Sequence, residues 1–128
     1  MPVALNHTIV AAHDRQESAE FLAGLLGLEV GEPWGPFLPL PLDNGVTLDF
    51  ASTDQEIATQ HYAFLVSDEE FDEIYARVLR AEVTYYADPA MATVNQINHH
   101  HHGRGFYFFD PAGHGMEVLT RPYGYAGD

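Results

Sequence analysis

The stretch Arg104–Leu119 reads Arg-Gly-Phe-Tyr-Phe-Phe-Asp-Pro-Ala-Gly-His-Gly-Met-Glu-Val-Leu. Apolar runs near its two ends, at 105–109 and 116–120, predict two short β-strands. The segment Asp110-Pro111-Ala112-Gly113 between them predicts a turn, because proline presets a negative φ and glycine accepts a positive one. Glu117 therefore stands inside an apolar strand, where a carboxylate is costly to bury unless it has a partner. The alternative is that strand alternation points Glu117 towards solvent.

A helix is predicted to begin at Ser67, upstream of this stretch. Ser67 and Glu70 have the spacing of a capping box, in which the hydroxyl and the carboxylate each satisfy backbone donors of the first turn. Acids fill that turn and arginines follow near the end, as the helix dipole favours. Apolar residues recur at helical spacing and define one buried face, namely Phe71, Ile74, Tyr75, Val78 and Leu79.

An earlier segment repeats this design. Asp14 is a suitable helix cap, and Gly27 is suited to a left-handed stop. A short apolar run with one histidine precedes each helix and predicts a strand, with His7 in the first run and His61 in the second. The apolar stripe of the earlier helix is Phe21, Leu22, Leu25 and Leu26.

The two segments indicate an internal repeat. His7 and His61 are 54 residues apart (61 − 7), and the same offset aligns Asp14 with Asp68 and Leu25 with Leu79. Each half therefore reads β-α-β-β-β, which predicts one α+β domain over 1–128, with module one at about 1–55 and module two at about 56–128. The further strands are expected at about 28–30, 37–40, 46–51, 83–86, 105–109 and 116–120.

Turn residues define the breaks between these strands. Asn44-Gly45 is a strong signal for a hairpin turn. Four prolines make residues 31–43 irregular or edge-like rather than a central strand; they are Pro33, Pro36, Pro39 and Pro41.

The composition excludes several classes of function. The chain has 128 residues, with 19 acids against five basic residues, and its net charge is −14. That charge repels phosphate, so nucleic acid and anionic membranes are poor partners. No apolar run is long enough to span a bilayer, and the start does not resemble a secretory signal. A cytoplasmic location is the expectation.

The missing residue types narrow the chemistry further. The chain has no cysteine and no lysine, so thiolate sites, disulfides and a Schiff base are excluded. No nucleotide-binding glycine loop or nucleophile elbow occurs. Eight histidines and many carboxylates remain, which favours imidazole–carboxylate metal chemistry if the chain is an enzyme.

The order of these motifs resembles the vicinal oxygen chelate superfamily, which includes glyoxalases, bleomycin-resistance proteins and extradiol dioxygenases. The resemblance rests on Leu5-Asn6-His7-Thr8, on Leu25-Leu26-Gly27-Leu28, on His61-Tyr62-Ala63-Phe64 and on the stretch that closes with Phe109–Leu119. It covers nearly the whole chain. It implies two βαβββ modules whose mixed sheets curl into a cup around a divalent metal ion.

The resemblance also implies the ligands. Carried over position by position, they are His7, His61 and Glu117, with Asp49 at the fourth equivalent position. Asp49 is one methylene shorter than the glutamate or glutamine that glyoxalases have there, so its reach is in question. Two imidazoles and one carboxylate leave an ion open positions for two adjacent substrate oxygens. Glu117 is also the candidate catalytic base. Zinc, iron, manganese and nickel all remain open.

Other residues have two interpretations each. The run His99–His102 is either a flexible polar loop that binds metal adventitiously, which we favour, or a loop near the site that supplies an acid or base. Arg104 either recognises a substrate carboxylate or pairs with surface acids. His114 is interpreted as a turn residue. Four aromatic residues either line a substrate cup or, as we favour, belong to the core; they are Trp34, Phe37, Phe50 and Tyr107.

The leading prediction is a metal-dependent lyase, isomerase or dioxygenase that acts on a small molecule with vicinal oxygens. The alternative is a metal-free protein that sequesters a drug, in the manner of bleomycin-resistance proteins, and the acidic surface suits a cationic ligand. The presence of all three ligand types favours the enzyme. The resemblance also implies a homodimer.

Overall fold

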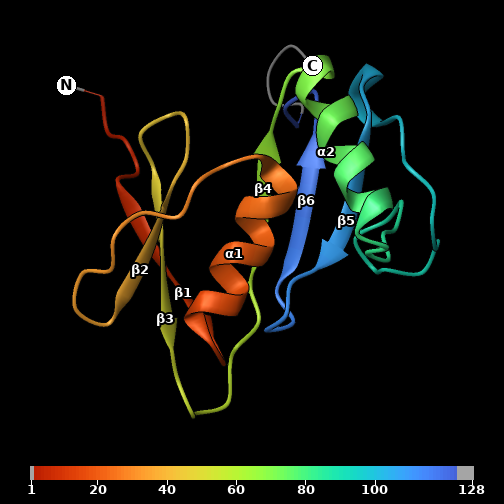
Figure 1. Cartoon of the computed structure of the whole chain (residues 1–128). Coiled ribbons are helices and arrows are strands. Elements are labelled where there is room, and N and C mark those ends of the chain that lie inside the picture. Colours follow the sequence, from red (N-terminus) through yellow and green to blue (C-terminus); the bar gives the residue numbers. More distant parts are fainter. Residues whose placement is uncertain (1, 124–128) are drawn as a thin grey trace. The chain divides into compact units, whose positions relative to one another are not determined.

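The structure is a computed structural model that describes residues 2–123. It divides into two compact units, Met1–Ala58 and Thr59–Asp128, and over the described residues each unit contains one α-helix and one three-stranded sheet (Figure 1). The predicted α+β class is therefore confirmed. Among residues 2–123, no helix has the length and apolar character needed to cross a membrane.

The first unit places a helix between the first and second strands of its sheet. Its elements are β1 (His7–Ala12), α1 (Arg15–Leu26), β2 (Phe37–Pro41) and β3 (Thr47–Ser52). The sheet order is β1-β3-β2, with β1 parallel and β2 antiparallel to β3. Asn44-Gly45 turns the chain between β2 and β3, with Gly45 at φ 87°, as predicted.

The second unit has the same connections, as the internal repeat predicts. Its elements are β4 (His61–Leu65), α2 (Asp68–Arg80), the 3₁₀ turn η1 (His100–His102), β5 (Gly105–Phe109) and β6 (Gly115–Leu119). The sheet order is β4-β6-β5, again with one parallel and one antiparallel pair. The turn between β5 and β6 has Gly113 at φ 91°, and the amides of Ala112 and His114 donate to Oδ1 of Asp110.

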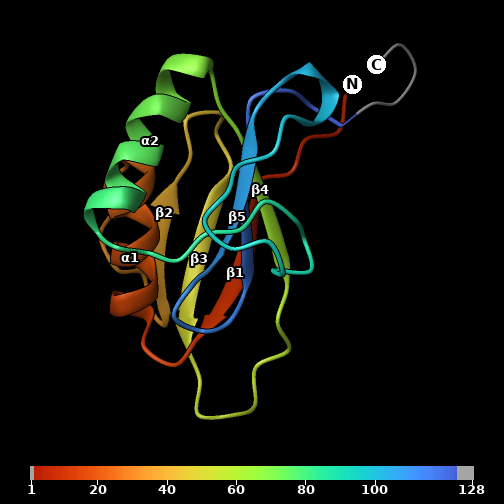
Figure 2. The ribbon, with the colours of Figure 1, turned by 90° about the vertical axis from the view of Figure 1, so that its right-hand side faces the viewer.

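Helix α1 begins and ends at the predicted residues. Oδ1 of Asp14 accepts hydrogen bonds from the amides of Gln16 and Glu17, at 2.9 and 3.3 Å, and Gly27 ends the helix at φ 73°. The helix lies along one face of its sheet (Figure 2). Of the predicted stripe, Leu22, Leu25 and Leu26 are buried and Phe21 is half-buried.

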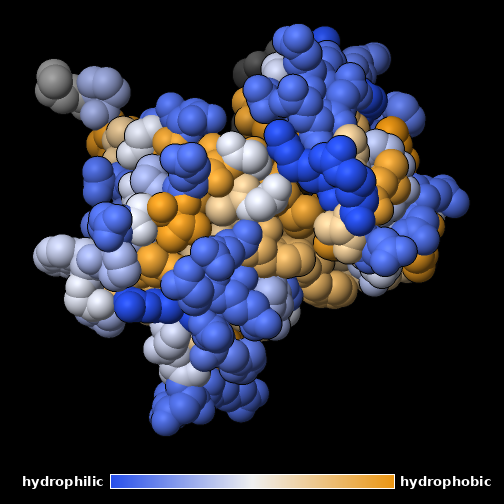
Figure 3. Space-filling view, in the orientation of Figure 1, coloured by the Kyte–Doolittle hydropathy of each residue, from blue (hydrophilic) through white to orange (hydrophobic). Residues whose placement is uncertain are grey.

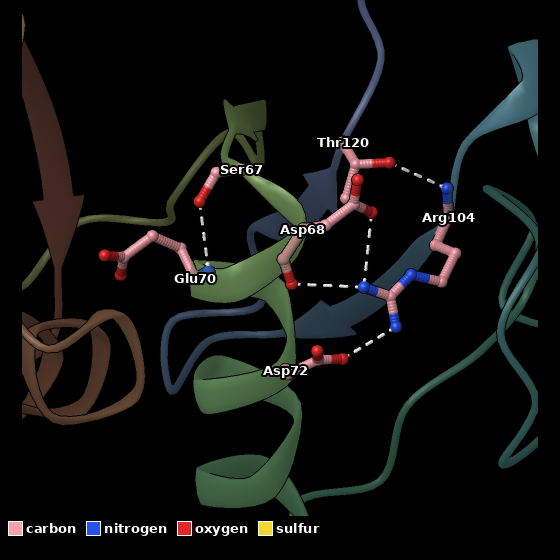
Figure 4. Close-up of polar contacts among 6 residues, drawn as sticks. All are labelled: Ser67, Asp68, Glu70, Asp72, Arg104 and Thr120. Atoms are coloured by element: carbon pink, nitrogen blue, oxygen red, sulfur yellow. Dashed lines mark hydrogen bonds and ion pairs between the residues drawn. The ribbon is translucent and has the colours of Figure 1, made fainter.

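The buried face of helix α2 is narrower than the periodicity predicts. Oγ of Ser67 accepts from the amide of Glu70 at 3.1 Å, which is the hydroxyl half of the predicted capping box, while the Glu70 carboxylate points away from Ser67 (Figure 4). Leu79, predicted to be buried, is 51% exposed. The outer surface of α2 is otherwise mostly hydrophilic (Figure 3). The buried residues are Phe71, Ile74 and Val78.

The strand predicted at 28–30 does not form, which corrects the β-α-β-β-β reading of the first half. One backbone bond, from the amide of Gly31 to the carbonyl of Pro39 at 2.9 Å, joins this segment to β2. Pro39 has no N–H to return a second bond, and the same is true of Pro41 at the end of the strand. The outer edge of β2 therefore cannot sustain a regular ladder.

The strand predicted at 83–86 is reduced to one residue, Tyr86, which forms isolated bridges with Val94 and with Tyr107. Tyr86 exchanges two backbone hydrogen bonds with Tyr107 of β5, each 2.8 Å long. Two positions along, Gly105 pairs instead with Asn98 from the 87–103 loop. Two different segments therefore share the outer edge of β5, and neither is long enough to be a strand.

Candidate functional site

Strand alternation divides the side chains of the first sheet between its two faces. Val10, Leu48 and Phe50 are buried on the face that α1 covers. His7 pairs with Thr47, and Ile9 with Asp49, on the opposite face. The predicted ligand His7 and the fourth-position residue Asp49 therefore share a face, with His7 exposed and Asp49 half-buried.

The second sheet divides in the same way. Phe106 packs against Phe71 of α2 with the ring centroids 5.4 Å apart, so the even-numbered residues of β5 face the helix. Tyr107 is aligned with Glu117 in the β5–β6 register, and His61 lies on the same face as both. The structure thus brings His61 and Glu117 together on the side of the sheet away from α2.

The backbone orients the imidazole of His61. Its Nδ1 lies 3.0 Å from the carbonyl of Gly115, which can only accept, so Nδ1 donates to it and Nε2 is the nitrogen that faces Glu117. Gln60, the residue before His61, is also held at both backbone groups. Its amide donates to Nδ1 of buried His114 at 3.0 Å, and the carbonyl of Gln60 accepts from the amide of Gly115. His114 is therefore a structural turn residue, as interpreted from the sequence.

His7 has a similar arrangement. Its Nδ1 is 2.8 Å from Oδ1 of Asn6, an amide oxygen that accepts the proton and leaves Nε2 free. In both histidines an oxygen acceptor therefore holds Nδ1, and Nε2 is the nitrogen that can bind a metal ion. A metal-binding histidine usually donates its other ring nitrogen to such an oxygen.

Glu117 is buried, with a relative exposure of 2%. Its Oε1 lies 3.0 Å from Nε2 of His61, and its Oε2 accepts a 2.8 Å hydrogen bond from the hydroxyl of Tyr123. Because Tyr123 donates its proton to Glu117, Tyr107 must donate to Tyr123 across the 2.9 Å contact between the two hydroxyl oxygens. Both carboxylate oxygens thus have partners.

The two tyrosines keep their protons. Burial, the hydrogen bond to Tyr123 and the charge of Glu117 raise the pKa of Tyr107 far above its usual value of 10. Burial also raises the pKa of Tyr123, as does its bond to Glu117, although the bond from Tyr107 lowers it in part. Both groups therefore act as hydrogen-bond donors at neutral pH.

The chemistry of this pair fits a cation. When the only proton of the ring is on Nδ1, the lone pair of Nε2 faces Oε1 of Glu117. A shared proton or a metal ion resolves that repulsion. His61 and Glu117 are therefore suitable ligands for a divalent ion, with Gly115 and Tyr123 as their outer supports.

The predicted ligands are distributed over both units. His7 and Asp49 belong to the first unit, and His61 and Glu117 belong to the second. Within residues 2–123 no group of three or more histidine, aspartate and glutamate side chains is gathered as a metal site. The pair His61–Glu117 is the part of the set that lies within one unit.

The histidine run is not a featureless loop. His100–His102 form the turn η1, and His101 and His102 have positive φ angles of 56° and 64°. The ring of His101 lies 5.1 Å from that of Tyr123, measured between centroids. The run thus contacts the tyrosine that supports Glu117, and its role as an acid, a base or an adventitious metal site stays a prediction.

Arg104 pairs with acids of α2. Its guanidinium donates to Asp72 at 2.7 Å and to Asp68 at 3.3 Å (Figure 4). It also lies 4.4 Å from the centroid of the Phe71 ring, over the face of that ring. The backbone amide of Arg104 also donates to Thr120. The hydrogen bond to Asp72 raises the pKa of the Arg104 guanidinium most. The hydrogen bond to Asp68 and the charges of the two carboxylates raise it further. Of its two interpretations, pairing with surface acids is the one that the structure supports.

Comparison with known proteins defines the class. The family model described as the Glyoxalase/Bleomycin resistance protein/Dioxygenase superfamily matches residues 4–118. The chain belongs to this superfamily, and the predicted vicinal oxygen chelate resemblance and glyoxalase-like fold are confirmed.

Three relatives illustrate the range of the class. Glutathione transferase FosA from Serratia marcescens is 34% identical over 122 residues, covering 90% of this chain and 79% of that protein. The solved structure of oxidase ChaP-H2 is 55% identical, with a TM-score of 0.95 and coverage of 99% of this chain and all of the other. Lactoylglutathione lyase from Agrobacterium tumefaciens, 19% identical, shares the fold with a TM-score of 0.70, covering 93% of this chain and 94% of that one.

Sequence reasoning missed the hydrogen-bonded support of Glu117. Tyr107 lies in the aromatic run 106–109 before the turn. Nothing in that run indicates that its hydroxyl belongs to the support of Glu117. Strand alternation does contain a signal, because Tyr107 and Glu117 are opposite each other in a hairpin closed at 110–114. Tyr123 lies beyond the last strand, where no periodicity indicates its direction.

Proposed function

We propose that the chain is a metal-dependent enzyme that acts on a small molecule with two adjacent oxygen atoms. His7, His61 and Glu117 would hold one divalent ion, which supplies Lewis acidity to the chelated oxygens when bound. The observation that carries the proposal is the pair His61–Glu117, a buried carboxylate whose Oε1 lies 3.0 Å from Nε2 of an imidazole that the carbonyl of Gly115 orients.

The protein's own residues suit proton transfer at this position. Glu117 would take a proton from substrate carbon or oxygen at Oε1, while Tyr123 holds Oε2. The donation from Tyr107 to Tyr123 keeps that hydroxyl directed at the carboxylate. A carboxylate with one oxygen fixed by a hydrogen bond and the other facing an imidazole is a suitable base. Burial of Glu117 and Tyr107 keeps bulk water away from it.

Relatives support an enzyme rather than a scaffold. Their names describe an oxidase, a glutathione transferase and a lactoylglutathione lyase. Because one ligand arrangement serves many reactions in such a fold, the proposal extends to a lyase, an isomerase or a dioxygenase as a group. The ion would be zinc, iron, manganese or nickel.

We also propose a cytoplasmic homodimer. Large apolar side chains are exposed on the sheet faces away from the helices, with Ile9 at 55%, Leu65 at 60% and Phe109 at 48% exposure. A second copy would cover such surfaces. Light scattering on purified protein tests this, and a monomer over the full concentration range would contradict it.

The metal proposal is tested by elemental analysis of tag-free protein washed with a weak chelator. We expect about one ion per chain in the wild type, as one three-ligand site requires, and loss of that ion in His7→Ala, His61→Ala and Glu117→Gln. His13→Ala is the matched control, because His13 is exposed and outside the set.

A second control removes the histidine run. Replacing His99–His102 by alanines leaves the stoichiometric ion in place if the run binds metal only adventitiously. Absence of any stoichiometric ion in the wild type, after each candidate ion has been offered back, would contradict the proposal. The alternative, drug sequestration without metal, would then be the better explanation.

A further inference from the structure

The first unit contains a pocket of its own. It has a volume of about 330 Å³ and is lined only by residues of that unit, among them His7, Trp34, Phe37, Thr47 and Asp49. That volume is within the range of small-molecule sites. Its floor is the sheet face that carries His7 and Asp49, on the side away from α1.

One wall is aromatic and is held in place. The rings of Trp34 and Phe37 stack with centroids 6.3 Å apart and planes 16° apart. Two backbone hydrogen bonds join these residues, 2.9 and 3.0 Å long, around a tight turn with Gly35 at φ 58°. Nη1 of Arg15 donates to the carbonyl of Gly35 at 3.1 Å. The backbone thus fixes this turn on the body of the unit.

The indole is nevertheless open to solvent. Trp34 has a relative exposure of 77%, although it is the one tryptophan of the chain. A large aromatic side chain that is held by its backbone and remains uncovered offers a flat surface for stacking. Its position at the edge of a pocket, rather than on a flat surface, directs that stacking towards a small molecule.

The polar lining selects among aromatic ligands. Asp49 is a half-buried carboxylate, and the hydroxyl of Thr47 and the imidazole of His7 lie on the same floor. The lining has no arginine, and the chain has no lysine, so in metal-free protein no arginine or lysine would compensate an anionic group that faces Asp49. A hydroxyl or amino group would instead donate to that carboxylate.

We propose that this pocket binds the planar aromatic part of a small molecule that carries hydroxyl or amino donors. The ring stacks on Trp34, and a donor group reaches Asp49. The assignment rests on the proposed function in one respect: His7 lines the pocket, so the bound molecule is the substrate of the metal site. Binding itself requires no metal ion.

Because Trp34 is the sole tryptophan, its fluorescence reports on this pocket directly. The probe is 2,3-dihydroxynaphthalene, a neutral aromatic molecule with two adjacent hydroxyls. Cyclohexane-1,2-diol keeps the diol without the aromatic ring, and 3-hydroxy-2-naphthoate keeps the ring with an anionic group. In metal-free protein we expect saturable quenching by the first probe and binding about tenfold weaker for each of the other two.

Variants locate the bound molecule. Equilibrium dialysis of Trp34→Leu and of Asp49→Asn is expected to show binding of 2,3-dihydroxynaphthalene weakened by about three- to tenfold. Phe109→Leu is the matched control, since Phe109 is an exposed aromatic residue of the other unit and its loss leaves binding unchanged. Circular dichroism confirms that each variant is folded.

The experiment is run on metal-free and on metal-loaded protein, so that the two proposals fail separately. If metal-free protein shows saturable quenching but takes up no stoichiometric ion when each candidate ion is offered, the pocket is supported and the metal enzyme is contradicted. No saturable binding in either form overturns the pocket. Equal binding of cyclohexane-1,2-diol, or wild-type affinity in Trp34→Leu, overturns it as well.

Discussion

The hydroxyl of Tyr123 donates a 2.8 Å hydrogen bond to Oε2 of Glu117, whose other oxygen faces His61. The donor comes from the segment after β6, whereas its acceptor is in the middle of that strand. Residues beyond the last strand are therefore part of the support of the candidate ligand, and they influence it without binding an ion themselves.

Tyr123→Phe is predicted to weaken metal binding about tenfold, the lower end of the usual effect of losing an outer-shell partner. The phenylalanine keeps the ring contact with His101 and removes the hydroxyl. A chelator competition titration measures the affinity. Tyr75→Phe, which removes a hydroxyl in the core of the same unit, should not alter it, and equal losses in both variants would contradict a specific role of Tyr123.

Arg104→Met is predicted to destabilise the protein by about 1–2 kcal/mol. The change removes two ion pairs with exposed carboxylates, those of Asp72 and Asp68, and the stacking of the guanidinium over Phe71. Methionine retains part of the apolar contact. Urea unfolding measures the loss, and part of it should disappear in high salt, because exposed pairs are screened.

Arg80→Met is the matched control for this change. Arg80 is an exposed residue at the end of α2, the helix that contains Asp68 and Asp72. Its loss is expected to cost less than about 0.5 kcal/mol, as is usual for surface substitutions. A loss in Arg104→Met no larger than in Arg80→Met would show that the contacts of Arg104 contribute nothing to stability.

Gly103→Ala is predicted to destabilise the protein by about 1–3 kcal/mol, the usual cost of overpacking. A Cβ at Gly103 would lie 2.5 Å from Cγ of Arg121 and 2.6 Å from Oγ1 of Thr120, which itself accepts from the amide of Arg104. The segment that leads to Tyr123 must therefore move. Gly24→Ala in α1 is the control, because its Cβ meets nothing within 4 Å.

Thermal unfolding compares these two glycine variants. Gly24→Ala is expected to be neutral or stabilising by about 0.5–1 kcal/mol, since alanine favours the helix. Metal affinity is measured in parallel, and Gly103→Ala should reduce it if displacement reaches Tyr123. Equal stabilities for the two variants would mean that the segment 120–121 yields without cost.

The sequence predicted the parts of the fold that local physics determines. Caps at Asp14 and Ser67 and the left-handed glycines at 27, 45 and 113 follow from side-chain chemistry and backbone φ alone. The edge segments at 28–30 and 83–86 depend on the hydrogen-bonding capacity of a neighbouring strand. Periodicity does not indicate whether the neighbouring strand can form those hydrogen bonds. Pro39, which has no N–H to donate, could have excluded the strand at 28–30.

The candidate site also has one part that the sequence could predict and another that it could not. The facing positions of His61 and Glu117 follow from strand register once the repeat is recognised. The tautomer of His61 depends on a carbonyl 54 positions away in sequence, and the partner of Oε2 comes from beyond the last strand. Such long-range contacts have no local signature, so sequence patterns could indicate the ligands but not what holds them.

The last prediction concerns alkaline pH. The hydrogen bond that the hydroxyl of Tyr85 donates to that of Tyr75, with an oxygen–oxygen distance of 2.6 Å, and burial raise the pKa of Tyr85 from its usual value of 10 to about 12. The folded state thus holds this proton more tightly than the unfolded chain does. The associated stability is fully present below pH 10 and is lost as the pH rises from 10 to about 12. Tyr75→Phe removes the largest cause, so Tyr85 is expected to titrate closer to 10, as measured by NMR of ring-labelled tyrosine. Tyr62→Phe should leave that titration unchanged, and an unaltered midpoint in Tyr75→Phe would show that burial alone holds the proton.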